Sequence, residues 1–169
     1  MKTNTNRREL IEQNRRKLSI KSMYFNRYLF VRYVTVFFFF ANIHWLISLH
    51  MSNSPLYFIP LILLIVILIS IIEQVKLYSN HTNNVKYTRY CFNILLYANI
   101  VFLLLACFST TFSMLYPFLL NDMKSKVLAI VILFLEIWLS RSILNRLNKI
   151  RRNEDKHYER IKQYEEFLN

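Results

Sequence analysis

The chain has 169 residues, a formal net charge of +12 and a hydrophobic share of 54%, and it contains no glycine. A soluble domain of this length would carry about 12 glycines and a smaller apolar share of about 45–50%. Because phosphate-binding loops, dinucleotide fingerprints and nucleophile elbows need glycine at their turns, the composition excludes these classes of site. The near absence of helix-breaking residues predicts a chain that is almost wholly helical.

Residues 1–28 form a basic segment, in which Thr5 to Tyr28 is predicted to be a moderately amphipathic helix. We expect this segment to lie on the inner leaflet of a membrane, where each Lys or Arg near anionic lipid contributes about 1 kcal/mol. The candidate contacts to lipid headgroups are Arg7, Arg8, Arg15, Arg16 and Lys17. Nucleic-acid binding through the same charges is the alternative, and it is disfavoured because no recognition motif accompanies them.

Four apolar segments follow, each near the length of about 20 residues that crosses the hydrocarbon core as a helix. The second has one polar residue, Ser70, between Pro60 and Ile72, so it has no polar face for water. We therefore predict an all-α polytopic membrane protein, in which Pro117 ends the third span. The transmembrane domain covers residues 29–144, with spans at 29–51, 56–75, 91–117 and 127–144.

The basic residues predict the orientation of these spans. Of the 22 Lys and Arg residues, all but Lys124 and Lys126 lie in the N-terminal segment, around the loop between spans two and three, or in the C-terminal tail. Because positive charge is retained on the cytoplasmic side, we expect both termini in the cytoplasm and the protein in the plasma membrane. Its Lys-, Asn-, Ile- and Phe-rich sequence resembles small four-span proteins of AT-rich Gram-positive bacteria.

Residues 145–169 are predicted to form a cytoplasmic helix that continues span four, as one helix from Val127 to about Leu168. Apolar residues recur there with the alternating four- and three-residue spacing of a short coiled coil. The seam residues are Leu147, Ile150, Ile161, Tyr164 and Leu168. Two alternatives stay open: this seam packs on the chain's own cytoplasmic segments, or it pairs with a partner protein or a second copy.

Five polar residues within the spans form a candidate intramembrane centre: Glu136, Asn42, His44, Asn99 and Ser140. A carboxyl group at the middle of a span is costly, and burial favours its protonated form. Glu136 therefore has three interpretations. It donates a hydrogen bond to Asn42 or His44, it relays protons or binds a substrate, or it pairs with a basic residue of a partner subunit. Asn99 lies on a face of small residues of span three that is typical of helix packing, and a substrate path there is the alternative.

Glu73 lies near the inner end of span two and is expected to form a charge pair with Lys76, three residues on. The histidines and cysteines lack the spacing of a metal site, and no catalytic triad can be assembled. We therefore expect no catalytic residue, no metal and no cofactor. The sequence favours a non-enzymatic accessory or interaction subunit of a membrane complex. The alternative is a small transporter or bacteriocin-immunity-type protein that uses the centre around Glu136.

Overall fold

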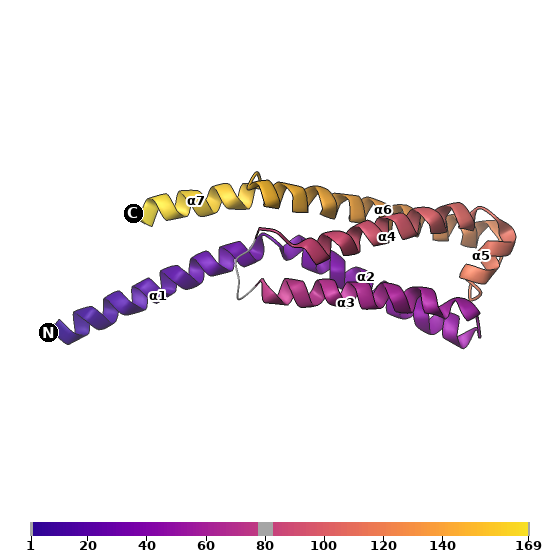
Figure 1. Ribbon diagram of the computed structural model, residues 1–169, viewed down its shortest axis with the longest axis horizontal. Coiled ribbons are helices and arrows are strands. Elements are labelled where there is room, and N and C mark those ends of the chain that lie inside the picture. Colours follow the sequence, from indigo (N-terminus) through magenta and orange to yellow (C-terminus); the bar gives the residue numbers. More distant parts are fainter. Residues whose placement is uncertain (1, 78–82, 169) are drawn as a thin grey trace.

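In the computed structural model, every regular element in the described part of the chain is a helix (Figure 1). The structure describes residues 2–77 and 83–168, and their side chains except those of residues 2–6, 9, 10, 165, 167 and 168. In chain order the elements are α1 (Lys2–Asn26), α2 (Leu29–Met51), a 3-10 turn η1 (Pro55–Tyr57), α3 (Phe58–Lys76), α4 (Lys86–Ala106), α5 (Ser109–Leu115), α6 (Met123–Arg152) and α7 (Lys156–Leu168).

The four long apolar helices α2, α3, α4 and α6 lie side by side and alternate in direction. Neighbours in the chain pack on each other: α2 on α3, α3 on α4, and α4 on α6, whereas α6 touches α2 at only a few places. The bundle has two different ends. Both chain termini extend from one, here called the termini end, and α5 caps the other, here called the α5 end (Figure 1).

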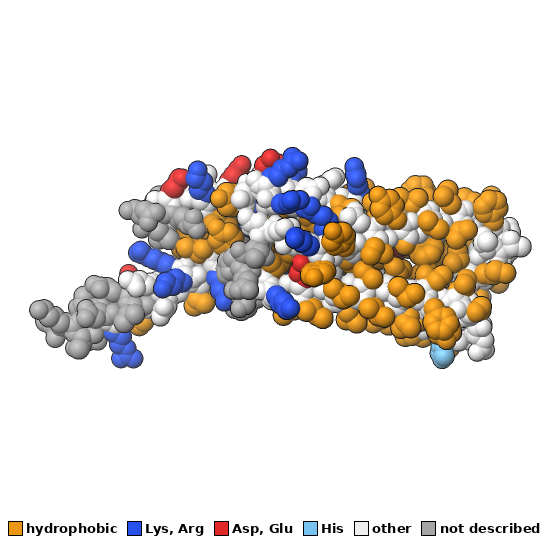
Figure 2. All heavy atoms as spheres, viewed as in Figure 1, with side chains coloured by type: hydrophobic (Ala, Val, Ile, Leu, Met, Phe, Trp, Pro, Cys, Tyr) orange, Lys and Arg blue, Asp and Glu red, His pale blue; other side chains and the backbone are white. Residues whose placement is uncertain are grey.

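The outer surface of the bundle is apolar. In the most apolar stretch of each span, only 28–39% of the residues are buried inside the protein. Large apolar side chains face outward, among them Phe40, Ile62 and Val131, which are 62%, 60% and 59% exposed. Figure 2 shows apolar side chains over the spans, with Lys and Arg gathered toward the termini end. Such a continuous apolar exterior needs lipid around it, so the chain is a multi-pass membrane protein.

The first two spans follow the sequence prediction closely. The helix α2 has the predicted bounds of 29–51. The helix α3 starts at Phe58, two residues after the predicted start of the span, because the chain first forms the 3-10 turn η1. Ser54 begins this turn, since its hydroxyl accepts the backbone N–H of Leu56 at 3.4 Å. Pro60 lies in the first turn of α3, where a missing N–H is tolerated.

The third span differs from the predicted 91–117 at both ends. It starts five residues early, at Lys86, and it ends at Ala106 rather than at Pro117. The chain is extended at Phe108 and then forms the short helix α5. Thr111 explains part of this break, because its hydroxyl donates to the backbone carbonyl of Leu105 near the end of α4. Hydroxyl side chains that bind nearby carbonyls compete with continued helix.

The fourth span begins at Met123, where the carboxylate of Asp122 accepts the backbone N–H of Ser125 at 2.9 Å. The hydrogen bonds from the Ser125 side chain and backbone lower the pKa of Asp122 below its ordinary value. The helix α6 continues past the predicted end of the span to Arg152, but the expected single helix to Leu168 is wrong. Asn153 is in the left-handed region with φ 57°, which ends α6, and α7 starts three residues later.

The basic helix α1 differs from the expected interfacial arrangement. It leaves the termini end along the long axis of the bundle, alongside α7, instead of lying flat across that end (Figure 1). Arg7 lies about 30 Å along the helix from Arg27 by the helical rise. This distance exceeds the depth of a headgroup layer, which is roughly 5–8 Å on each side. Only the last turns of α1 are therefore near the membrane in this arrangement.

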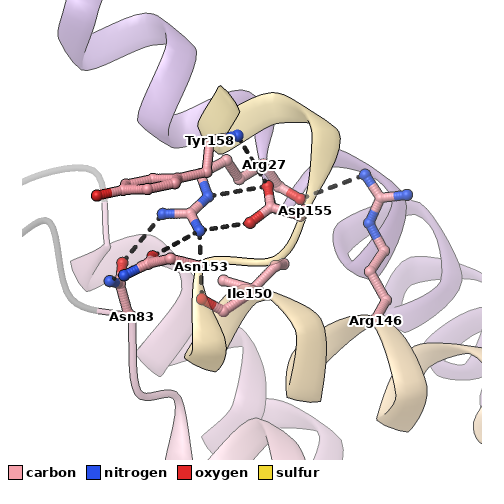
Figure 3. A network of polar contacts seen from close by, with 7 residues as sticks. All are labelled: Arg27, Asn83, Arg146, Ile150, Asn153, Asp155 and Tyr158. Atoms are coloured by element: carbon pink, nitrogen blue, oxygen red, sulfur yellow. Dashed lines mark hydrogen bonds and ion pairs between the residues drawn. The ribbon is translucent and has the colours of Figure 1, made fainter. Parts of the chain in front are cut away.

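A buried arginine holds α1 to the α6–α7 junction (Figure 3). The guanidinium of Arg27 pairs with the carboxylate of Asp155 through two hydrogen bonds, of 2.5 Å and 3.1 Å. It also donates to the side-chain oxygens of Asn83 and Asn153 and to the backbone carbonyl of Ile150. These five residues are called the Arg27 cluster below, and they join the α1–α2 link, the segment before α4, the end of α6 and the α6–α7 link.

Several contacts offset the cost of burying the positive charge of Arg27. Arg27 is only 1% exposed, and its guanidinium also lies 5.1 Å from the ring centre of Tyr158. The carbonyl of Ile150 belongs to the last turn of α6, where a cation interacts favourably with the helix dipole. A fully hydrogen-bonded pair of this kind fixes geometry, and breaking it by removing one partner is strongly destabilising.

Replacing Arg27 by Met should lower the free energy of unfolding by about 3–5 kcal/mol, because Asp155 would keep its charge without its partner. Denaturant titration in detergent micelles, followed by circular dichroism, measures this change. Lys162→Met is the matched control, since its pair with Glu166 is exposed on both sides and contributes about 0.5 kcal/mol or less. A loss for Arg27→Met no larger than that of the control would contradict the structural role of the cluster.

Candidate functional site

A cavity of about 460 Å³ lies between α2, α4 and α6 in the half of the bundle near α5. It is called the α2–α6 cavity below, and most of its walls are apolar. It is lined by Phe37, Ala41, Asn42, His44, Trp45, Leu63, Asn99, Phe102, Tyr116, Phe118, Leu119, Leu128, Ala129, Ile132, Leu133, Leu135 and Glu136.

The cavity opens toward the lipid-facing surface. Its lining includes exposed residues of two helices, Phe37 and His44 from α2 and Leu128, Ile132 and Leu135 from α6. These helices are the neighbours that touch each other least in the bundle. The cavity therefore borders the apolar exterior of the bundle where α2 and α6 meet.

Two buried amides in the cavity wall each have one side-chain atom without a hydrogen-bond partner. Asn42 donates its Nδ2 to the carbonyl of Phe38 at 2.9 Å, which leaves its Oδ1 without a partner. Asn99 has no partner at its Nδ2, although it is only 4% exposed. Buried polar groups of native proteins are nearly always paired, so each exception calls for an explanation such as a bound ligand.

Glu136 of α6 and Asn99 of α4 line the same cavity. Among the described residues no hydrogen bond joins Glu136 to Asn42 or His44, although all three line the same space. The reason is packing: α6 lies along α4 over most of its length and approaches α2 only locally.

The other two residues of the proposed centre contribute differently. His44 is exposed and lies at the rim of the cavity. Ser140 is fully buried one helical turn beyond Glu136, and its hydroxyl has no partner, but it is not among the lining residues. The structure thus brings Asn42, Asn99 and Glu136 together and leaves Ser140 outside the cavity.

A second polar group of residues, nearer the termini end, is fully paired. Gln74 donates to the hydroxyls of Thr35 at 2.9 Å and Ser70 at 3.0 Å, and Ser70 in turn donates to Thr88 at 3.2 Å. Thr88 donates its hydroxyl to Glu73 at 2.8 Å. These five residues are called the Gln74 network below, and they join α2, α3 and α4. Because its side chains satisfy one another, the network is structural.

Sequence reasoning missed most of the Gln74 network and misassigned Glu73. The carboxylate of Glu73 accepts the backbone N–H groups of Tyr87 and Thr88, at 3.2 Å and 2.6 Å, and so caps the start of α4. The expected pair between Glu73 and Lys76 is not present among the described ion pairs. The helix start needs an acceptor for its free N–H groups, and this carboxylate from α3 supplies one.

The proposed lipid contacts and the proposed seam lie outside the cavity. The five basic residues of α1 are exposed. Leu147, Ile150 and Ile161 are each 1% exposed, because helices of the same chain cover them. Tyr164 is half-buried, and the side chain of Leu168 lies outside the described residues. These positions fit the alternative in which the seam packs on the chain itself.

Comparison with known proteins finds no family model, no curated protein and no solved structure that matches the chain. Within the described residues, no three His, Cys, Asp or Glu side chains lie close enough together to hold a metal ion. The binding properties of the α2–α6 cavity follow from the groups that line it. It offers hydrogen-bond acceptors, one amide donor and a carboxyl group within an apolar pocket.

Replacing Asn99 by Leu should leave the free energy of unfolding unchanged or raise it by up to about 1 kcal/mol, since the change removes an unpaired buried donor. Replacing Gln74 by Leu should lower it by about 1 kcal/mol, because two hydrogen bonds are lost. Thermal unfolding of both variants in the same detergent tests the difference. A destabilisation by Asn99→Leu equal to that by Gln74→Leu would show that Asn99 has a structural role.

Proposed function

We propose that this protein is a non-enzymatic membrane protein that binds a lipid-soluble molecule in the α2–α6 cavity, as a small transporter or an immunity-type protein would. The observation that carries the proposal is a cavity open toward lipid that contains unpaired, buried Asn42 and Asn99 atoms. A void that served packing alone would have apolar walls, because unpaired polar groups destabilise a fold. A ligand with polar and apolar parts would satisfy both kinds of surface.

We also propose that both termini lie in the cytoplasm and that the membrane is the plasma membrane of a Gram-positive bacterium. The support is the charge distribution along the bundle. Both terminal helices and the basic residues next to the α3–α4 connection gather at the termini end. Only Lys124 and Lys126 lie toward the α5 end. An excess of Lys and Arg at one end of a bundle is typical of its cytoplasmic side.

An accessory role in a membrane complex is the second candidate, and one observation favours it. The part of α1 between Arg7 and Leu18 projects from the bundle, and its described side chains are exposed, including the apolar Ile11 and Leu18. An exposed basic helix with a few apolar residues suits an acidic surface on a partner protein. In this proposal the docking element is α1, because the seam of the C-terminal tail is covered within the chain.

Filling the cavity should abolish ligand retention without unfolding the protein. Native mass spectrometry of protein purified in mild detergent should detect a bound small molecule in the wild type and none in Ala129→Trp, because Ala129 lines the cavity. The matched control is Val131→Trp, which places the same ring two positions on, where the side chain is 59% exposed on the apolar exterior and outside the cavity lining. Equal retention by both variants, or no bound species in the wild type, would contradict the proposed function.

Docking through α1 should depend on its charge. Replacing Arg15, Arg16 and Lys17 together by Gln should reduce the amount of a co-purified partner by at least about tenfold, because three charge pairs at about 0.5–1 kcal/mol each are lost. Quantitative mass spectrometry of the complex measures this. A variant with Lys156 and Lys162 changed to Gln provides the control on α7. Equal recovery from both variants would exclude α1 as the docking element.

A further inference from the structure

The walls of the α2–α6 cavity are rich in aromatic rings. Five of its lining residues are aromatic: Phe37, Trp45, Phe102, Tyr116 and Phe118. Three of them form a connected wall, in which Trp45 lies edge-on to Phe102 at 5.2 Å and stacks on Tyr116 at 6.0 Å between ring centres. The faces of aromatic rings carry negative potential and attract organic cations, most strongly when water is excluded.

The wall with Trp45 is fixed in place before any ligand binds. The indole Nε1 of Trp45 donates to the backbone carbonyl of Leu115 at 3.0 Å, which ties α2 to the end of α5. The Tyr116 ring also packs against Phe112 at 5.5 Å between ring centres. Side chains held this way lose little further freedom when a ligand arrives, so they favour binding.

The polar groups of the cavity have the same electrostatic preference as its rings. Glu136 supplies a carboxyl group, and the unpaired Oδ1 of Asn42 is a second acceptor. The unpaired Nδ2 of Asn99 is a donor, and it lines the same cavity as Glu136. No Lys or Arg is among the lining residues, and His44 lies at the exposed rim. An anionic headgroup would find no countercharge here, whereas a cation would find a carboxyl group that ionises to pair with it.

Building on the proposed function, we infer that the ligand of the α2–α6 cavity is a lipophilic organic cation with an apolar body and an ammonium group. The ammonium donates hydrogen bonds to the carboxylate form of Glu136 and to Oδ1 of Asn42, which gives the unpaired acceptor a donor. In the bound state the Nδ2 of Asn99, which has no partner in the free protein, donates to this carboxylate and holds it in place. The apolar body lies against the aromatic wall and the aliphatic side chains that lead to the lipid.

A series of three probes with the same alkyl chain separates charge from apolar binding. Octylammonium, octanol and octanoate are titrated calorimetrically into the full-length protein in nanodiscs of zwitterionic lipid, and the heat with empty nanodiscs is subtracted. Octylammonium should bind at least about tenfold more tightly than octanol, because hydrogen bonds to charged groups contribute about 1.5–3 kcal/mol. Octanoate should show no saturable binding.

Two substitutions at Glu136 test the role of its charge. Glu136→Gln should reduce octylammonium affinity about tenfold or more and leave octanol affinity within about twofold, since the amide keeps the shape and loses the charge. Glu136→Asp should retain the preference for the ammonium probe. An unchanged preference in Glu136→Gln, shown by a protein with the thermal stability of the wild type, would overturn the assignment of Glu136.

The outcomes distinguish an error in the inferred ligand class from an error in the proposed binding site. If octanol binds as tightly as octylammonium and both are lost in Ala129→Trp, the cation inference is wrong and the cavity remains a binding site. A further outcome is that the affinities of the three probes are all the same in Ala129→Trp as in the wild type. If the wild type then still retains a native small molecule that this variant lacks, the inferred ligand class is again wrong. If the retained species is a membrane lipid alone, the cavity binds acyl chains and the inference fails.

Discussion

Hydrocarbon around the four spans is the constraint on which the structure depends, because lipid offers no hydrogen bonds to a polar group. The outward surface of the spans is accordingly formed by large apolar side chains, while Thr35, Ser70, Gln74 and Thr88 are buried between helices. Each of these four has a partner on another helix or within the Gln74 network. Helix association here relies on such contacts and on close packing, since lipid removes the usual hydrophobic drive between helices.

Because of the same constraint, the unpaired polar atoms of the α2–α6 cavity are unusual. Near the termini end, every polar side chain of the Gln74 network is paired, and the carboxylate of Glu73 caps α4. Nearer α5, Asn42 and Asn99 are buried with unpaired atoms beside Glu136. Natural proteins accept such local costs at functional sites, where a ligand completes the pairing. Arg32 Nη2 and the Ser140 hydroxyl are also buried without partners, but only Asn42 and Asn99 line this cavity, and that is the physical basis for assigning it a binding role.

The Arg27 cluster shows how the parts outside the membrane are organised. A cation next to a membrane entrance is expected to face lipid headgroups or water, yet Arg27 is buried and fully hydrogen-bonded. It joins segments that are more than 120 residues apart in the chain, so α1 and α7 leave the bundle as neighbours. This arrangement buries the apolar seam residue Ile161 against other parts of the same chain and leaves the N-terminal part of α1 exposed.

Local pattern in the sequence determined the number of spans, the bounds of α2, the helical content and the gathering of charge at one end. Apolar runs and basic flanks act over short stretches, and their preference for lipid or water does not depend on the rest of the fold. Tertiary contacts decided the rest: the start of α4 set by Glu73, the break at Asn153, the Arg27–Asp155 pair and the position of Asn99 and Glu136 in one cavity. Each of these depends on groups from different helices, whose separation in space follows from packing and cannot be computed from spacing along one helix.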